Sequence, residues 1–179
     1  MRMVLAAIIA GVLAAPLPLA AQQAAGSGAA DQPKVDVTRN GDWEVACQEV
    51  DRNGQKTKAC EMRQVLVQKE TKKEWLRLAV SYAPDGKGPV LRIFTPLGVL
   101  LQPGMVMTID NGEPVRMQYA VCLARPPRCL VAGPMDEKLT NLMKRGIQGQ
   151  LSIMLPNNQQ VNAPFSLKGF TASLNSLPQ

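Results

Sequence analysis

The most informative absence in this sequence is histidine, which does not occur among its 179 residues. Without imidazole, neither a Ser-His-Asp triad nor a Cys-His pair can form, and no histidine can act as a general acid or base. Zinc and iron sites that use imidazole ligands are excluded for the same reason. Chemistry that depends on histidine is therefore excluded. We expect a protein that is not an enzyme and holds no metal or other cofactor, with a hydrolase that uses carboxylates as an alternative.

Aromatic residues are also few, because Phe, Trp and Tyr together make up 4% of the chain. The basic residues are scattered and form no long tract. Proteins that bind single-stranded nucleic acid combine a basic groove with aromatic platforms on which the bases stack. The sequence therefore predicts no nucleic-acid partner.

Long apolar runs are absent except at the N-terminus. There VLAAIIAGVL follows MRM and precedes PLPLAAQQ, the order of regions in a secretory signal peptide. This run is shorter than the roughly 20 residues that span a bilayer. We predict a signal peptide over residues 1–21, a flexible leader over 22–40, and a single disulfide-stapled β-rich domain over 41–179. The mature chain is then exported without a transmembrane segment, to the periplasm, to the outer membrane or to the exterior.

Removal of the signal peptide leaves 19 basic and 14 acidic side chains. This excess either serves solubility or attracts an anionic partner such as a phosphorylated glycolipid, a sulfated glycan or an acidic protein surface. Two loops are the predicted contacts: KETKKE, with Lys69, Lys72 and Lys73, and ARPPR, with Arg125 and Arg128. Guanidinium groups suit carboxylate, sulfate and phosphate. The alternative for each loop is a solvated tip without a ligand.

The predicted domain consists of short alternating segments separated by turn residues. Turn signals such as Asn53-Gly54 recur about every 8 to 12 residues, as in antiparallel sandwiches and barrels. One helix is expected over PMDEKLTNLMKRG, with Pro134 in its first turn, and its core-facing residues are Met135, Leu139, Leu142 and Met143. We predict an all-β fold, mainly an antiparallel β-sandwich or barrel, with this mid-chain helix and a short C-terminal helix over LKGFTASLNSL.

The four cysteines are Cys47, Cys60, Cys122 and Cys129, separated by 12, 61 and 6 residues. These spacings match neither the repeated C-x2-C of zinc sites nor the C-x-x-C of redox pairs. Export places the chain in an oxidising compartment, where cysteines form disulfides. Of the three possible connectivities, we favour the local pairs Cys47–Cys60, across an Asn-Gly turn, and Cys122–Cys129, around Pro126-Pro127.

The order of these features resembles the invasion-associated locus B family. The resemblance rests on GDWEVACQ, PLGVLLQPGMVMTID, the C-x6-C segment, MDEKLTNLMKRG and PFSLKGFTASLNSL, and it covers about residues 41–177. It implies a small exported β-rich protein of a Gram-negative bacterium, periplasmic or associated with the outer membrane. The family takes its name from a role in the invasion of host cells. The resemblance implies no catalytic residues.

Three functions follow from these observations. The first is a non-enzymatic binding or envelope protein that presents loops to a protein, glycan or envelope component. The second is a chaperone or assembly factor that binds through an exposed sheet edge. The third is a hydrolase that uses carboxylates, for which Asp110, Glu113 and Asp85 are the candidates, although turn chemistry also explains all three. The sequence leaves the partner and the oligomeric state open.

Overall fold

The computed structural model describes residues 34–83 and 86–178, which belong to one unit, Pro33–Gln179. The predicted signal peptide, most of the predicted leader and Asp85 lie outside the described residues. The described residues form the following elements in chain order: β1 (Val35–Asn40), β2 (Trp43–Arg52), β3 (Gln55–Val67), β4 (Glu74–Tyr82), β5 (Pro89–Thr95), β6 (Met105–Ile109), β7 (Val115–Met117), β8 (Tyr119–Ala124), β9 (Pro127–Pro134), α1 (Glu137–Arg145), β10 (Gln148–Met154), β11 (Gln160–Ser166) and α2 (Phe170–Asn175).

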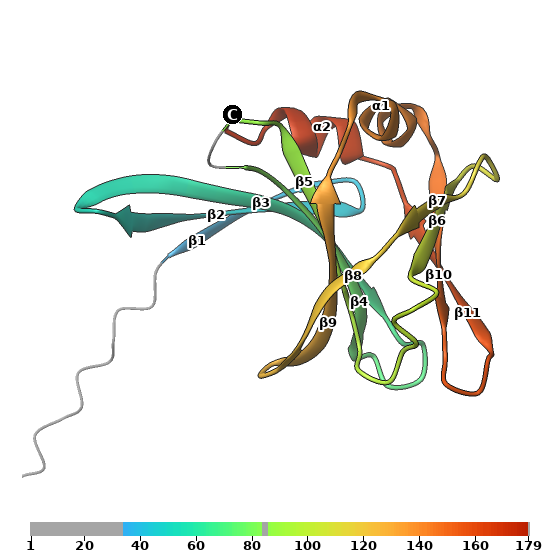
Figure 1. Ribbon diagram of the computed structural model, residues 1–179. Coiled ribbons are helices and arrows are strands. Elements are labelled where there is room, and N and C mark those ends of the chain that lie inside the picture. The colour runs from blue at the N-terminus through green and yellow to red at the C-terminus, as the bar shows by residue number, and fades with distance from the viewer. Residues whose placement is uncertain (1–33, 84–85, 179) are drawn as a thin grey trace, which may run out of the picture. The chain divides into compact units, whose positions relative to one another are not determined.

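The strands form two sheets. Sheet A has the order β1-β2-β3-β4-β5-β9-β8, and sheet B has the order β11-β10-β6-β7 (Figure 1). Every strand pairing is antiparallel. Only Gln118 separates β7, an edge of sheet B, from β8, an edge of sheet A. A strand that changes sheets in this way is typical of a sandwich corner. The predicted β-rich fold with two helices is confirmed.

The core lies between the inner faces of the two sheets. In β6 buried and half-buried residues alternate: Met105 and Met107 are completely buried and Ile109 is nearly so. From sheet A the strands β4 and β5 contribute Leu76, Leu78, Val80, Leu91 and Ile93. Polar residues or arginines alternate with many of these positions, so one face of sheet A packs inward and the other faces solvent.

The mid-chain helix differs from its prediction in two respects. Asp136 caps α1 by accepting a hydrogen bond from the Leu139 backbone N–H (2.7 Å), so the helix begins at Glu137. Pro134, predicted for the first helical turn, is instead the last residue of β9, where it pairs with Val90. Leu142 does not face the core: it is 38% exposed, because it lies on the side of α1 that lines a surface cavity.

A junction around Trp43 joins the two sheets to the C-terminal helix. The Trp43 ring is completely buried and meets Phe170 of α2 edge to face, with centroids 5.2 Å apart. Its indole N–H donates to the carbonyl of Ser166 (2.9 Å), and Gln64 exchanges hydrogen bonds with the backbone of the same residue. The GDW and PFSLKGF segments, which carry the family resemblance, thus meet in space.

Gly169 completes this junction at the start of α2, where it is the N-cap residue. Its φ is +90°, and a Cβ there would collide with the carbonyl of Asn40. Next to it, the N–H of Asp42 donates to the carbonyl of Lys168 (3.0 Å). The turn between β1 and β2 therefore packs directly on the segment before α2, and only glycine fits at position 169.

The strand β1 lies within residues that the sequence assigns to a flexible leader. All six of its residues pair with β2, and Arg39 forms an ion pair with Glu44 (2.6 Å). The strand is short and all its residues are exposed or half-buried, which explains why no hydrophobic rhythm marks it in the sequence. The ordered domain therefore begins before residue 41.

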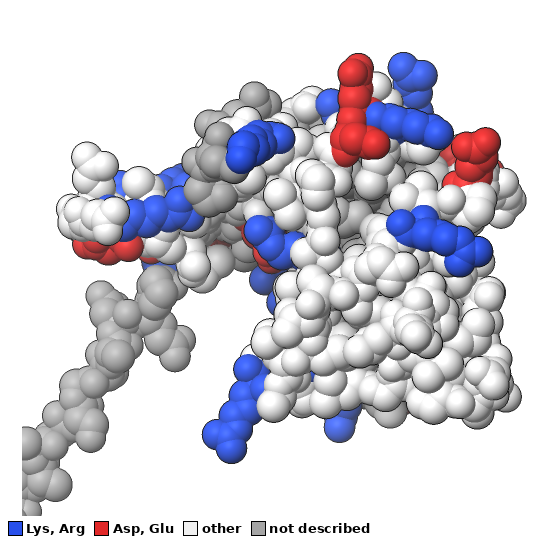
Figure 2. Space-filling view, in the orientation of Figure 1, with Lys and Arg blue, Asp and Glu red and all other residues white. Residues whose placement is uncertain are grey.

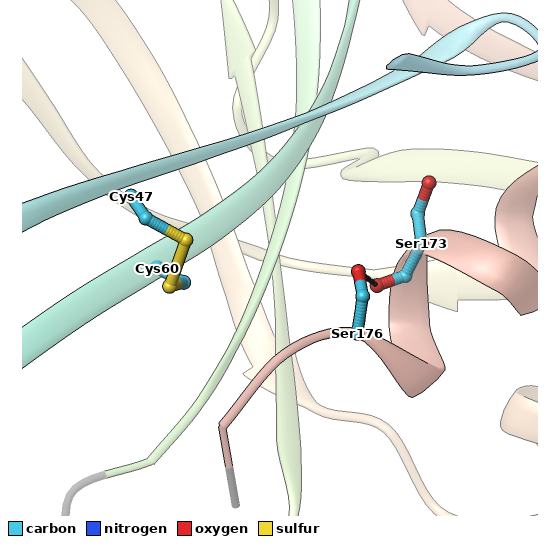
Figure 3. Close-up of a disulfide and its surroundings, with 4 residues drawn as sticks. All are labelled: Cys47, Cys60, Ser173 and Ser176. Carbon is cyan, nitrogen blue, oxygen red and sulfur yellow. Dashed lines mark hydrogen bonds between the residues drawn. A yellow bond between two sulfur atoms is a disulfide. The ribbon is translucent and has the colours of Figure 1, made fainter. Parts of the chain in front are cut away.

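Two disulfides join directly opposed residues of neighbouring strands. They connect Cys47 of β2 to Cys60 of β3 and Cys122 of β8 to Cys129 of β9, the two local pairs that the sequence favours. Figure 3 shows the first bridge between its two strands, with Ser173 and Ser176 at the end of α2; the Ser176 hydroxyl donates to the Ser173 carbonyl (2.8 Å). Beyond this bridge, β2 and β3 continue as a two-stranded ribbon that extends past the rest of the sheet (Figure 1).

Candidate binding surface

The solvent face of sheet A carries a row of side chains that crosses five strands. The register aligns Val65, Arg77, Phe94, Leu130 and Val121 across β3, β4, β5, β9 and β8. Directly opposed residues of antiparallel strands lie on the same face, so these side chains are neighbours. Leu123 and Arg128 form the next pair on the same face. We call the residues around Phe94 the Phe94 surface; it consists of Arg77, Phe94, Val121, Leu123, Arg128 and Leu130.

Two guanidinium groups flank the ring of Phe94. The Cζ atom of Arg128 lies 5.2 Å from the ring centroid and that of Arg77 lies 6.0 Å from it, both within the range of cation–π attraction. Each such contact contributes about 0.5–1 kcal/mol at an exposed site. The ring therefore holds both guanidinium groups against the sheet.

The two arginines differ in their polar partners. Arg77 pairs with Glu74 (2.6 Å), while its Nε atom is buried without a hydrogen-bond partner. No carboxylate of the described residues pairs with Arg128. An unpaired guanidinium on a solvent-facing sheet retains its full capacity for carboxylate, sulfate or phosphate.

The structure separates the two arginines of the ARPPR loop. Arg125 lies at the tip of the β8–β9 hairpin and is exposed, whereas Arg128 lies within β9 and stacks on Phe94. The sequence predicts both on one rigid tip. Arg128 leaves the tip because Pro127 already belongs to β9, so that Arg128 pairs with Leu123.

The lysines of KETKKE lie in the turn between β3 and β4, and Lys69, Lys72 and Lys73 are exposed. This turn is ordered, because the N–H of Gln68 donates to the carbonyl of Lys73 (3.0 Å). It lies at the same end of sheet A as the tip of the β8–β9 hairpin, since β4 begins and β5 ends there beside the start of β9 (Figure 1). The fold thus brings the two predicted basic loops to one end of sheet A, with the Phe94 surface between them.

The carboxylates proposed for hydrolysis do not form a catalytic pair. Asp110 uses its carboxylate to accept backbone N–H groups from Ile147 (3.0 Å) and Gln148 (3.0 Å). Glu113 is exposed and faces Lys138 (3.4 Å). Within residues 34–83 and 86–178, no group of three or more His, Cys, Asp or Glu residues is arranged to hold a metal ion. Asp110 therefore has a structural role that connects the β6–β7 turn to the start of β10.

A cavity of about 470 Å³ is lined by β7, by the second half of β9 and by α1. Val115, Met117, Val131 and Leu139 provide its apolar lining. Of the polar residues at its rim, Asp136 caps α1 and Lys138 pairs with Glu113, and Arg116 and Gln118 also line the cavity. Two of its polar side chains therefore already make contacts within the fold.

Tyr119 lies at the start of β8, near the sandwich corner. Its hydroxyl is buried without a hydrogen bond of good geometry. Burial raises the pKa of Tyr119 above its ordinary value of 10.0, and the neighbouring Thr95 side chain offsets part of this rise. The neutral phenol is therefore the form that the folded protein favours.

Sequence reasoning missed Arg77, Phe94, Val121 and Leu123 as members of a surface. The signal was present in the pattern VLRIF, where Arg92 and Phe94 alternate with buried residues. In β8 no such signal exists, because YAVCLA is apolar at nearly every position. Only the three-dimensional pairing shows that one of its edges is open and that residues 120–124 are exposed on both alternating sides.

The fold and this surface define a class: an antiparallel two-sheet protein with two cross-strand disulfides and an arginine-flanked aromatic residue on one open face. The family model described as "Invasion associated locus B (IalB) protein" matches residues 43–178. The chain belongs to the invasion associated locus B family.

A solved structure supports the same fold. The chain is similar to the crystal structure of invasion associated protein B from Bartonella henselae, with 21% sequence identity and a TM-score of 0.64. The likeness covers 78% of this chain and 92% of that chain. No curated protein matches the sequence. In the part of the chain that the structure describes, no helix is long and apolar enough to cross a bilayer.

Proposed function

We propose that the chain is an exported, non-catalytic binding protein of the bacterial cell envelope that recognises an anionic partner through the Phe94 surface. The observation that carries this proposal is the open cluster in which Arg128, without a carboxylate partner among the described residues, stacks on Phe94. Arginine and aromatic residues are enriched at the centres of protein interfaces. The two disulfides support export, because such bonds persist in oxidising compartments.

Charge defines the chemistry of the partner. The segment from Tyr119 to Pro134 contains Arg125 and Arg128 and no Asp or Glu. At the same end of sheet A lie Lys69, Lys72 and Lys73. A carboxylate-rich protein segment or a phosphorylated or sulfated glycan complements this distribution. Because exposed contacts are screened by salt, binding through them weakens as ionic strength rises.

The test is a crosslinking pull-down from the cell envelope with the mature chain as bait. Arg128→Gln removes the charge but keeps a polar, unbranched side chain, and Arg145→Gln, on the exposed last turn of α1, is the matched control. We expect the principal crosslinked partner to be lost with Arg128→Gln and retained with Arg145→Gln. Equal capture by both variants and the unmodified chain would contradict a role for the Phe94 surface.

An assembly factor for envelope proteins is a second candidate function, and a specific observation favours it. The edge strand β8 has no neighbour on its outer side among the described residues, and Val121 and Leu123 on it are 44% and 40% exposed. Binding through an open strand edge is one of the recurring modes of peptide recognition. In this function the partner is an unfolded or extended segment rather than a folded surface.

A further inference from the structure

The outer edge of β8 lacks the features that normally protect an edge strand. Natural sheets protect their edges with charged residues, proline, bulges, very short strands or a covering element. The sequence of β8, YAVCLA, has neither charge nor proline, and a single register shift lies only at its start, between Tyr119 and Val121. The opposite edge of sheet A, β1, carries Asp36 and Arg39. One edge strand of sheet A therefore carries charged residues and the other does not.

The hydrogen-bond alternation shows which backbone groups of β8 point outward. The N–H of Met135 donates to the carbonyl of Pro89 (2.9 Å), so alternate residues of β9 back to Cys129 bond toward β5. The intervening residues of β9 then bond toward β8, where their partners are Val121 and Leu123. Cys122 and Cys129 form a non-hydrogen-bonded pair, in agreement with their Cα separation of 3.9 Å. The N–H and C=O groups of Cys122 therefore point to the open edge, as do those of Ala124.

The side chains beside this edge set the chemistry of an added strand. On the solvent face, Val121 and Leu123 border the edge. The apolar surface extends from Val121 to Leu130 on β9 and then to Phe94 on β5. Figure 2 shows that the surface over β8 and toward β6 carries almost no acidic side chains, with basic side chains at its margins. Arg125 and Arg128 stand at one end of the strand without carboxylate partners among the described residues. A complementary strand has apolar residues at alternate positions and a carboxylate at its end.

We infer that the edge of β8 is a docking site for an extended segment of another envelope protein, which joins sheet A as an additional antiparallel strand. The segment presents branched apolar side chains toward Val121 and Leu123 and an acidic side chain toward Arg125 or Arg128. This inference rests on the proposed binding function and specifies where the partner binds and in what conformation. The Cys122–Cys129 bridge holds the edge in a fixed register, which lowers the entropic cost of adding a strand.

The probe is an acetylated, fluorescent peptide of about nine residues, enough to cover the strand, in which valine alternates with threonine and glutamate stands at both ends. Its binding to the mature chain is measured by fluorescence anisotropy. We expect Val121→Asp with Leu123→Asp to weaken binding about ten-fold or more, because it removes the apolar contact and repels the glutamates. The matched control is Val35→Asp with Val37→Asp on β1, where exposure is similar (47% and 48%); it should bind as the unmodified chain does.

Two N-methylated peptides test strand pairing itself. Valines beside Val121 and Leu123 direct their N–H groups away from β8, whereas the intervening threonines face Cys122 and Ala124. Methylation of the threonine N–H groups should abolish binding, and methylation of the valine N–H groups should leave it unchanged. If both methylated peptides bind, or neither does, the addition of an antiparallel strand is contradicted. The reverse pattern would indicate a parallel strand and overturn the antiparallel arrangement.

Thermal unfolding of both double variants checks that they fold. If the β8 variant does not fold, Ala124→Pro replaces it, because proline removes one outward N–H and is tolerated on edge strands. Sedimentation tests whether the unmodified chain forms a dimer as its concentration rises. If it does and the β8 variant does not, the edge of β8 binds a second copy of the chain, and the inference of a separate partner protein is overturned. If envelope crosslinking still depends on Arg128 while the peptide does not bind, the inference fails and the proposed function stands. If envelope crosslinking does not depend on Arg128 while the peptide binds specifically at β8, the proposed role of the Phe94 surface fails and the inference about β8 stands.

Discussion

Removal of the Cys122–Cys129 disulfide should destabilise the protein and specifically release β8. Among the described residues, β8 pairs with β9 alone, so the bridge and this one ladder hold the strand in place. We predict that Cys122→Ala with Cys129→Ala lowers the free energy of unfolding and increases local opening of the strand. The reason is that a covalent link limits the conformations of both the unfolded chain and the frayed hairpin.

The magnitude follows from the length of the closed loop. With a sequence separation of 7, chain entropy gives about 2.5 kcal/mol. Cys129 is 2% exposed, and its truncation to Ala removes one buried sulfur in addition. At about 2–4 °C per kcal/mol for a domain of this size, the midpoint of thermal unfolding should fall by about 5–10 °C.

The assay combines urea denaturation with hydrogen exchange of the peptide that contains residues 119–131. The control is Cys47→Ala with Cys60→Ala, whose loop separation of 13 gives about 3 kcal/mol. Both variants should lose similar stability, but only the first should lose protection in β8. Unchanged protection of β8 in the first variant, or equal loss of β8 protection in both, would refute the reasoning.

Three further substitutions test the junction and the corner. Trp43→Phe should cost about 2 kcal/mol, because it removes the hydrogen bond to Ser166 and leaves a gap beside Phe170; urea unfolding measures this loss. Gly169→Ala should cost about 2 kcal/mol or more through its left-handed backbone and the collision with Asn40, whereas Gly133→Ala, with open space around it, should cost far less in the same measurement. Because burial raises the Tyr119 pKa above 10.0, stability from the neutral phenol is present below pH 10 and lost as pH rises through the folded-state pKa; Tyr119→Phe should flatten the fall in urea midpoint above pH 10.

The sequence predicts much of the fold because local patterns determine it. Turn signals such as Asn53-Gly54 separate the strands as expected, and the cysteines flank hairpins that bring them directly opposite each other. The exposed strand β1 escaped prediction because nothing in its sequence requires burial. Helical periodicity predicts Leu142 in the core, because periodicity alone does not show that one part of a helix borders a cavity.

The candidate surface was less predictable than the fold. Arg128 was recognised as a contact residue, but its stacking on Phe94 depends on the pairing of β5 with β9, two strands separated by more than thirty residues in the chain. Likewise, nothing in YAVCLA distinguishes an edge strand from a central one, since both are rich in apolar residues. Strand order is a property of long-range pairing, and it decides whether those residues are buried or available.

The two edges of sheet A show how this strand order bears on function. Charged residues on β1 make pairing with another strand unfavourable, because added charge must be desolvated or matched. On β8 neither charge nor proline opposes pairing, and the disulfide keeps Cys122 and its outward backbone groups in place. An open and rigid edge also favours uncontrolled association, so retaining one carries a cost in solubility. A binding role for β8 explains both why its edge lacks charged residues and proline and why the second disulfide lies beside that edge. A purely structural role gives no reason for the two features to occur together.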